Sequence, residues 1–114
     1  MKLSVAGAAK AQAALTRAAE RLKDGFDRAV ADTVVSLANE ARQRAPHDTG
    51  RLRSAIKSKS DGGNGEVYVD KSVDYAAYVE FGTSTSPAHP FMGPASETHR
   101  ARFVKRITDA GKGF

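Results

Sequence analysis

The sequence contains no cysteine among its 114 residues. A disulfide-linked scaffold, a cysteine-based zinc site and a thiol nucleophile are therefore excluded. The lack of cysteine also fits a protein made in a reducing cytoplasm. No apolar run approaches the roughly 20 residues that a membrane-spanning helix requires, so we expect no membrane partner.

The length of 114 residues predicts one domain that covers residues 1–114. Hydrophobic residues make up 40% of the chain and charged residues 27%, which is ordinary for a globular domain. We expect the two ends, residues 1–9 and 111–114, to be flexible.

The net charge is +5, and it is concentrated towards the two ends of the chain. Residues 1–44 and 91–114 are basic, whereas residues 45–90 are close to neutral. This distribution fits a nucleic-acid neighbour. It fits equally well the solvated basic faces of ordinary helices.

Residues 8–45 predict one long helix, because they contain no proline and a single glycine. Their apolar side chains recur every three, four or seven residues, which makes one stripe along a helix. Pro46 ends the helix because proline disfavours helical geometry in the residue before it. We expect much of the stripe to pack on the rest of the chain and part of it on a neighbouring subunit. It consists of Leu15, Leu22, Phe26, Val30, Val34, Leu37 and Ala41.

The middle of the chain predicts a short helix followed by a β-hairpin. Residues 51–60 are read as a helical turn that passes into a strand near Ala55. The glycine- and asparagine-rich run 61–65 predicts the hairpin loop. Residues 66–70 form the return strand, with Val67 and Val69 on one face.

The last third of the chain predicts two further helices. Residues 75–81 form a short helix that Gly82 ends, residues 83–90 form a loop, and residues 91–110 form the final helix. We expect Tyr75, Tyr78, Val79 and Phe81 to lie in the core, as well as a stripe of Met92, Ala95, His99, Phe103 and Ile107. The fold class is α+β: a long N-terminal helix and a C-terminal helix packed on a small antiparallel β-sheet with a short helix.

No pattern for catalysis is found in the sequence. His47, His89 and His99 are not spaced as metal ligands, and they are read as ordinary surface, loop or packing residues. There is no Gly-x-Ser-x-Gly elbow and no phosphate-binding loop. We therefore expect no enzyme activity, no catalytic residue, no cofactor and no metal.

The final helix carries the side chains best placed to touch DNA phosphates, Arg100, Arg102, Lys105 and Arg106. The sequence has no zinc-finger or helix-turn-helix pattern, and its few aromatic residues lie at expected core positions. Phosphate contacts are therefore plausible, whereas sequence-specific recognition is not.

Three runs of the sequence form a recognisable set: Arg44-Ala45-Pro46-His47-Asp48-Thr49-Gly50-Arg51-Leu52-Arg53-Ser54-Ala55-Ile56, Tyr75-Ala76-Ala77-Tyr78-Val79-Glu80-Phe81-Gly82-Thr83 and Pro87-Ala88-His89-Pro90-Phe91-Met92-Gly93-Pro94-Ala95. Together they resemble a family of small head–tail joining, or minor tail, proteins of long-tailed phages, of the neck or tail-terminator type. The resemblance extends from about Leu37 to Ala95.

The resemblance implies a structural virion protein at the head–tail interface, assembled in the cytoplasm of the bacterial host. It implies a homohexameric ring that terminates the tail tube and joins it to the head-closure, or stopper, protein. The implied partners are other copies of the chain, the head-closure protein, the tail tube protein and the DNA that passes through the channel. The alternative is a small basic DNA-associated protein that acts through phosphate contacts alone.

Within the three runs, polar residues and one loop are the candidates for subunit and partner contacts. Glu80 lies between apolar residues and needs a partner, so we predict an ion pair with Arg51 or Arg53, within one subunit or across the ring. The loop from Thr83 to Pro90 is a candidate docking arm. The candidate interface residues are Asp48, Thr49, Arg51, Arg53, Glu80, Thr83, Ser84, Thr85, Ser86 and His89.

Overall fold

A computed structural model of the chain describes residues 5–46 and 50–111. The elements in chain order are α1 (Val5–Arg44), α2 (Arg51–Ala55), β1 (Ile56–Asp61), β2 (Asn64–Val69), α3 (Ala76–Phe81) and α4 (Met92–Gly111). The predicted α+β class is confirmed, and each expected helix and strand is present with its ends shifted by a few residues. The helix α1 begins at Val5, inside the range that was expected to be flexible.

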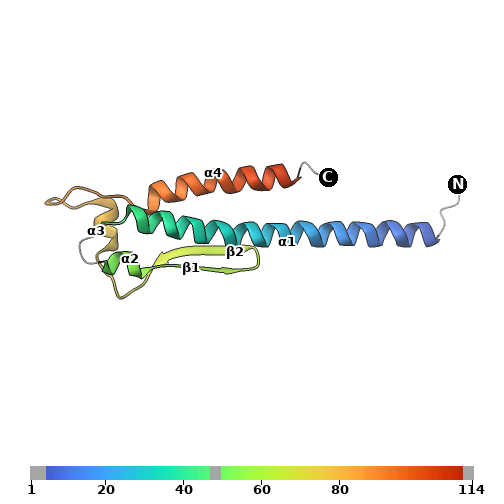
Figure 1. Ribbon diagram of the computed structural model, residues 1–114, viewed down its shortest axis with the longest axis horizontal. Helices are drawn as coiled ribbons and strands as arrows, with labels where there is room; N and C mark the ends of the chain where they lie inside the picture. The colour runs from blue at the N-terminus through green and yellow to red at the C-terminus, as the bar shows by residue number, and fades with distance from the viewer. Residues whose placement is uncertain (1–4, 47–49, 112–114) are drawn as a thin grey trace.

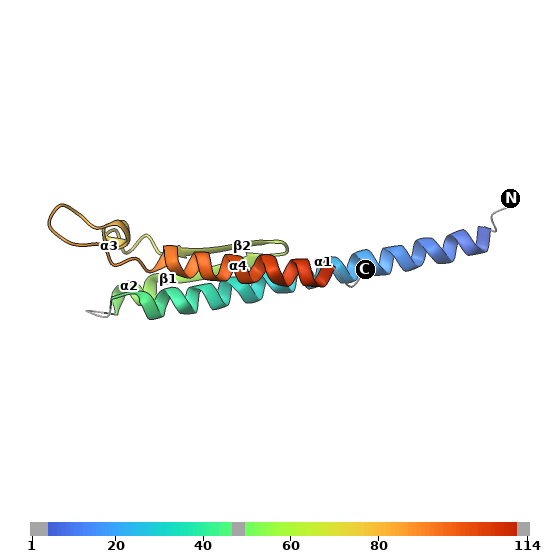
Figure 2. The same cartoon turned by 90° about the horizontal axis from the view of Figure 1, so that it is seen from above.

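The long helix α1 is the element on which the others assemble (Figure 1). Both α4 and the β1–β2 hairpin pack along its C-terminal part, and α2 packs at its end. The molecule is elongated, with extents of 77 × 24 × 19 Å. Its length arises because the N-terminal part of α1 continues past both α4 and the hairpin, as the two views agree (Figures 1 and 2).

The core is built largely from small side chains on α1. Ala38 and Ala41 of α1, and Ala45 directly after it, are buried and belong to one cluster with Ala95 of α4 and the hairpin. Small residues let neighbouring elements approach closely, which is how a single helix can bind α4 and a sheet along the same stretch. The largest fully buried side chains in the described residues are those of Phe91 and Ile56.

The hairpin is antiparallel, with Ile56 opposite Val69 and Asp61 opposite Asn64. Its strands extend further into the expected loop than predicted, so the connection consists of Gly62 and Gly63 alone. Gly62 has a positive φ of 58°, which suits the first central position of a two-residue hairpin turn. Val67 and Val69 share one face of β2, as predicted, and this face is half-buried against the core.

The sheet lies so close to α1 that a glycine is required on the second strand. A Cβ atom at Gly65 would come within 2.6 Å of Cγ1 of Val34 and 2.7 Å of Cγ1 of Val30. Arg42 fixes the start of the first strand, because its Nε and Nη2 donate to the carbonyl of Ile56 at 3.2 and 2.7 Å. The hairpin is thereby held to α1 at both of its ends.

The predicted stripe of α1 is buried only in its second half. Val30, Val34 and Ala41 are buried, whereas Leu15 and Leu22 are exposed. Phe26 lies at the boundary between the buried and the exposed part of the stripe. Its side chain is 38% exposed, and its ring contacts that of Phe103 edge-on at a centroid distance of 5.8 Å. The stripe is therefore buried where α4 and the hairpin cover α1, and it is exposed to solvent beyond them.

Candidate functional site

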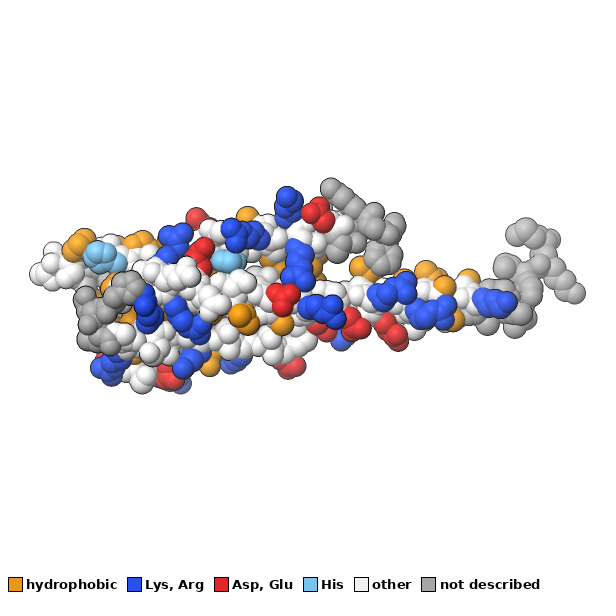
Figure 3. Space-filling model, in the orientation of Figure 1, with side chains coloured by type: hydrophobic (Ala, Val, Ile, Leu, Met, Phe, Trp, Pro, Cys, Tyr) orange, Lys and Arg blue, Asp and Glu red, His pale blue; other side chains and the backbone are white. Residues whose placement is uncertain are grey.

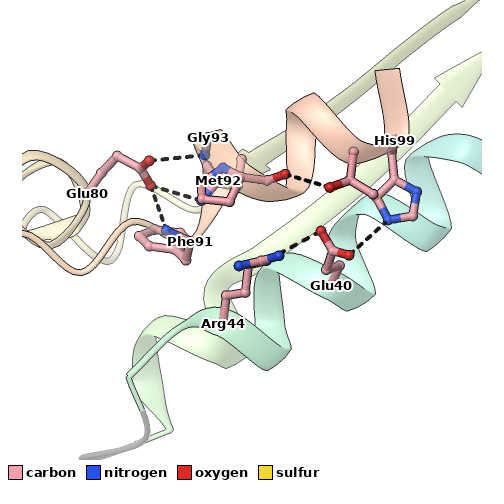
Figure 4. A network of polar contacts seen from close by, with 9 residues as sticks. Glu40, Arg44, Glu80, Phe91, Met92, Gly93 and His99 are labelled. Carbon is pink, nitrogen blue, oxygen red and sulfur yellow. Dashed lines mark hydrogen bonds and ion pairs between the residues drawn. The ribbon is translucent and has the colours of Figure 1, made fainter. Parts of the chain in front are cut away.

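The carboxylate of Glu80 holds the start of α4 (Figure 4). The backbone N–H groups of Phe91 and Met92 donate to its Oε1 at 3.1 and 2.9 Å, and that of Gly93 donates to Oε2 at 3.0 Å. The first amides of a helix lack partners inside the helix, and a carboxylate there also benefits from the helix dipole. Glu80, a residue of α3, therefore caps α4. Its hydrogen bonds close the loop that connects α3 to α4.

The environment of Glu80 shifts its acidity. Burial of the carboxyl group by itself raises its pKa, but the three backbone donors outweigh that effect, and the pKa of Glu80 lies below its ordinary value. The charged form is the one that the three amides stabilise. Glu80 therefore binds α4 as a carboxylate at neutral pH.

The ion pair predicted between Glu80 and an arginine is not formed among the described residues. The carboxylate contacts backbone amides, as described above. Arg51 donates instead to the carbonyl of Ser72 at 2.9 Å, and Nε of Arg53 donates to the carbonyl of Arg42 at 3.0 Å in the last turn of α1. The two arginines thus join segments of one subunit, and a pair across a subunit boundary stays a prediction.

The loop that follows α3 is folded by its own hydrogen bonds. The hydroxyl of Thr83 accepts the backbone N–H of Thr85 and of Ser86 at 3.3 and 3.0 Å. At its base the N–H of His89 donates to the carbonyl of Val79 at 2.8 Å. All four candidate loop residues, Thr83, Ser84, Thr85 and Ser86, and also His89, are exposed. The loop therefore projects as a preformed shape at one end of the molecule (Figure 2).

Two aromatic residues expected in the core are instead on the surface of α3. Tyr78 is 63% exposed and Phe81 is 80% exposed, whereas Tyr75 and Val79 pack partly against the core. The predicted helix is confirmed, but the predicted burial of Tyr78 and Phe81 is wrong, because α3 contacts the core on one side only. We call α3 and its loop, residues 75–89, the tip.

A hollow of about 410 Å³ opens on the tip. Its wall is partly apolar and comes from α3, the following loop, α2 and the end of α1. A volume of this size is within the range of binding pockets for small ligands or inserted side chains. The lining residues are Pro46, Leu52, Tyr75, Tyr78, Val79, Thr83, Ser86, Pro87 and His89.

The basic residues predicted to face DNA do not share one side of α4. At about 100° of turn per residue, Arg102, Lys105 and Arg106 lie on one flank of the buried stripe and Arg100 on the other. Arg106 pairs with Asp32 of α1 at 3.1 Å. Arg102 and Arg106 also line a hollow of about 160 Å³ between α1 and α4. The predicted set is thus divided, with three of its members forming one basic strip.

His99 lies in the buried stripe of α4, as predicted, and it faces α1 (Figure 4). Its Nε2 lies 3.7 Å from Oε1 of Glu40, whose other oxygen accepts Nε of Arg44 at 3.4 Å. The ring thus sits in the helix–helix contact. His89 is an exposed loop residue, and His47 lies outside the described residues.

Two further candidate residues, Asp48 and Thr49, also lie outside the residues that the structure describes. Within residues 5–46 and 50–111, no group of three histidine or acidic side chains is arranged to hold a metal ion. In the same ranges, no helix is long and apolar enough to cross a membrane.

Sequence reasoning missed the role of Arg42, which ties α1 to β1, and the exposure of Tyr78 and Phe81. The sequence does not indicate that an arginine on the polar face of a helix will donate hydrogen bonds to the backbone carbonyl of a residue far along the chain. The exposure of Leu15 had a signal in the length of α1, because a helix of 40 residues exceeds what a small domain can cover, and part of its stripe was accordingly expected to pack on a neighbouring subunit.

Comparison with known proteins identifies the family of the chain. Residues 1–82 match the model of a family described as "Bacteriophage HK97-gp10, putative tail-component". The match includes the long N-terminal helix and ends at Gly82, so the third run of the resemblance, Pro87–Ala95, lies beyond it. No curated protein and no solved structure matches the chain. Because the match covers more than half of its length, the chain belongs to this family of phage tail components.

Proposed function

We propose that this phage tail component forms a homo-oligomeric ring at the head–tail interface of the virion. In this role it terminates the tail tube and joins it to the head-closure protein. Its work is structural and not catalytic. The partners are other copies of the chain, the head-closure and tail tube proteins, and the DNA that passes through the ring during ejection.

The observation that carries the proposal is the exposure of large apolar side chains at both ends of an elongated subunit. Leu15 is on the projecting part of α1, while Tyr78 and Phe81 are on the tip, at the other end. Clustered apolar surface of this kind marks sites of protein contact. A subunit with two such ends fits an assembly in which each copy contacts neighbours on two sides.

The tip supports the docking part of the proposal. Its loop is rigidified by the hydrogen bonds of Thr83 and by the attachment of Glu80 to α4. Preorganised loops lose little conformational freedom on binding. Thr83–Ser86 and His89 are therefore the residues that we expect to contact a neighbouring subunit, the head-closure protein or the tail tube protein.

The experiment that tests the proposal is deletion of the gene from the parent phage, followed by negative-stain electron microscopy of the lysate. Overlong tails with separate filled heads would identify a tail terminator. Tails of normal length with separate heads would identify a joining protein. Intact particles of normal form would contradict the proposal.

A second function, binding of DNA phosphates by the chain alone, is favoured by one observation. Arg102 and Lys105 are exposed and make no ion pair with any residue that the structure describes. A salt titration of binding to duplex DNA separates the two functions. A DNA-binding protein loses affinity steeply with salt because counterions are released on binding, whereas a ring subunit shows little binding to free DNA.

A further inference from the structure

The N-terminal part of α1 is an apolar helix face without a cover in the described part of the chain. We call residues 5–22 the arm; they continue past α4 and the hairpin in both views (Figures 1 and 2). Leu15 is 71% exposed and Leu22 is 43% exposed. Ala11 precedes Leu15 and Ala18 lies between the two leucines, all at helical spacing, so these side chains form one narrow apolar ridge. Helices of this kind gain most of their stability from packing.

The tip is a second uncovered apolar surface, and it is hollowed. The wall of its 410 Å³ hollow includes Tyr78, Val79 and Leu52. Space-filling representation places apolar side chains both at the tip end and along the arm (Figure 3). One surface is a ridge and the other a depression, which is the shape relationship of two contacting partners.

The arm and the tip of one chain cannot meet, because they lie at opposite ends of a molecule 77 Å long. The arm, as a helix from residue 5 to residue 22, is about 27 Å long at ~1.5 Å per residue. The body of the molecule is 24 Å across its second dimension. The arm of one copy is therefore long enough to lie across the tip of another.

The arm is rich in basic side chains, whereas the segment that forms the tip has no lysine or arginine. Between residues 10 and 22 the arm carries Lys10, Arg17 and Arg21 against a single acidic residue, Glu20. From residue 72 to residue 99 the chain has no lysine or arginine. These three basic side chains of the arm make no ion pair within the described residues.

On the tip side, Asp74 is exposed and likewise makes no ion pair within the described residues. It stands beside Tyr75, which lines the hollow. An arginine can pair with this carboxylate or lie over the ring of exposed Tyr78. Charge and shape thus favour the same pairing.

We propose that the arm of one copy docks on the tip of the next copy, with Leu15 and Leu22 in the hollow and with Arg21 facing Asp74. The contact is heterologous, since each copy gives one arm and receives one. Repetition of such a contact closes into a ring when the rotation between copies allows it. The inference rests on the proposed ring and names the two surfaces that hold it together.

The test uses two variants that each destroy one surface, Leu15→Glu on the arm and Tyr78→Glu on the tip. Val35→Glu is the matched control, because Val35 is on the same helix α1 and is 53% exposed but lies on neither surface. Size-exclusion chromatography with light scattering gives the mass of each variant, and circular dichroism verifies that each remains folded. We expect oligomers for the wild type and for Val35→Glu, and monomers for the other two.

Mixing the two monomeric variants distinguishes this contact from others. Leu15→Glu retains an intact tip and Tyr78→Glu retains an intact arm, so the mixture forms heterodimers with one productive contact and no larger species. Oligomers of Tyr78→Glu alone would indicate that arms pair with arms, and would overturn the proposal. A wild-type chain that stays monomeric at the highest soluble concentration would overturn it as well.

The absence of native cysteine permits a second measurement that does not depend on loss of assembly. Ala14→Cys places a thiol on the arm and Ser86→Cys places one on the tip. Under mild oxidation we expect covalent dimers when the two variants are mixed and few when either is oxidised alone. Dimers from Ala14→Cys alone, without dimers in excess from the mixture, would contradict the pairing of arm and tip.

The outcomes of these experiments are separable from that of the gene deletion. Separate heads and tails in the deletion lysate together with unaffected assembly of Leu15→Glu and Tyr78→Glu would keep the proposed function and discard this contact. Intact particles in the deletion lysate would discard the function, while the mixing experiment would still report on the contact.

Discussion

Oε1 of Glu80 lies 2.9 Å from the backbone nitrogen of Met92, across a loop that separates two helices. This contact explains why a charged residue stands inside the apolar run Tyr78–Phe81. The carboxylate satisfies amides that α4 cannot satisfy itself, and it fixes the geometry of the loop from Thr83 to Pro90. One residue thereby couples the shape of the tip to the position of α4.

Replacement of Glu80 by Gln removes the charge that the amides of Phe91, Met92 and Gly93 stabilise. We expect the free energy of unfolding to fall by about 0.5–2 kcal/mol, the range for loss of a helix N-terminal cap. Urea denaturation followed by circular dichroism measures the change. The matched control is Glu97→Gln, an exposed residue of α4, which should change stability by less than about 0.5 kcal/mol. Equal effects of the two substitutions would contradict the capping role.

The contribution of Glu80 should depend on pH in a defined direction. Its pKa is lowered in the folded protein, so its stabilisation is fully present above the pKa of the unfolded chain, about 4.3. It is lost as the pH falls through the lower pKa of the folded state. The difference in stability between wild type and Glu80→Gln should therefore shrink on acidification. A difference that stays constant down to the acid limit of folding would argue against the charged cap.

Gly65→Ala should destabilise the fold because the added Cβ would overlap Val34 and Val30 on α1. Such overpacking costs about 1–3 kcal/mol. Gly25→Ala is the matched control, since no atom lies within 4 Å of its added Cβ in the exposed part of α1. It should stabilise the helix by about 0.5–1 kcal/mol. Thermal unfolding of both variants measures the two opposite shifts, and shifts of the same sign would refute the close approach of sheet and helix.

Arg42→Lys should weaken the attachment of the hairpin to α1. A lysine cannot reproduce the two hydrogen bonds that the guanidinium donates to the carbonyl of Ile56. We expect a loss of about 1–2 kcal/mol, against almost none for Arg28→Lys, an exposed position on the same helix. Hydrogen exchange of the hairpin amides should accelerate in the first variant. Unchanged exchange rates would show that the hairpin is held by other contacts.

Much of the fold follows from periodicity and turn chemistry. Local sequence alone predicts the apolar stripe of α1, the glycine-rich hairpin turn and the end of α3 at Gly82. Periodicity states which face of a helix is apolar, but not how far along the helix a partner extends. That limit explains why Val30 and Leu15, members of the same stripe, have opposite surroundings.

The candidate site was harder to predict because its main contact involves the backbone. The sequence indicated that Glu80 needs a partner, and Arg51 and Arg53 were the nearest candidates within the motifs. Backbone amides are present at every position, and only the path of the loop brings those of Phe91–Gly93 to the carboxylate. The exposure of Tyr78 and Phe81 has the same origin, since it depends on which side of α3 meets the core.

The measurement that tests the central claim most directly is the location of the chain in the intact virion, by cryo-electron microscopy of particles. The account predicts a ring of copies between the filled head and the first ring of the tail tube, with each arm lying on the tip of its neighbour. Density for the chain at the distal tail tip, along the tube or nowhere in the particle would contradict it.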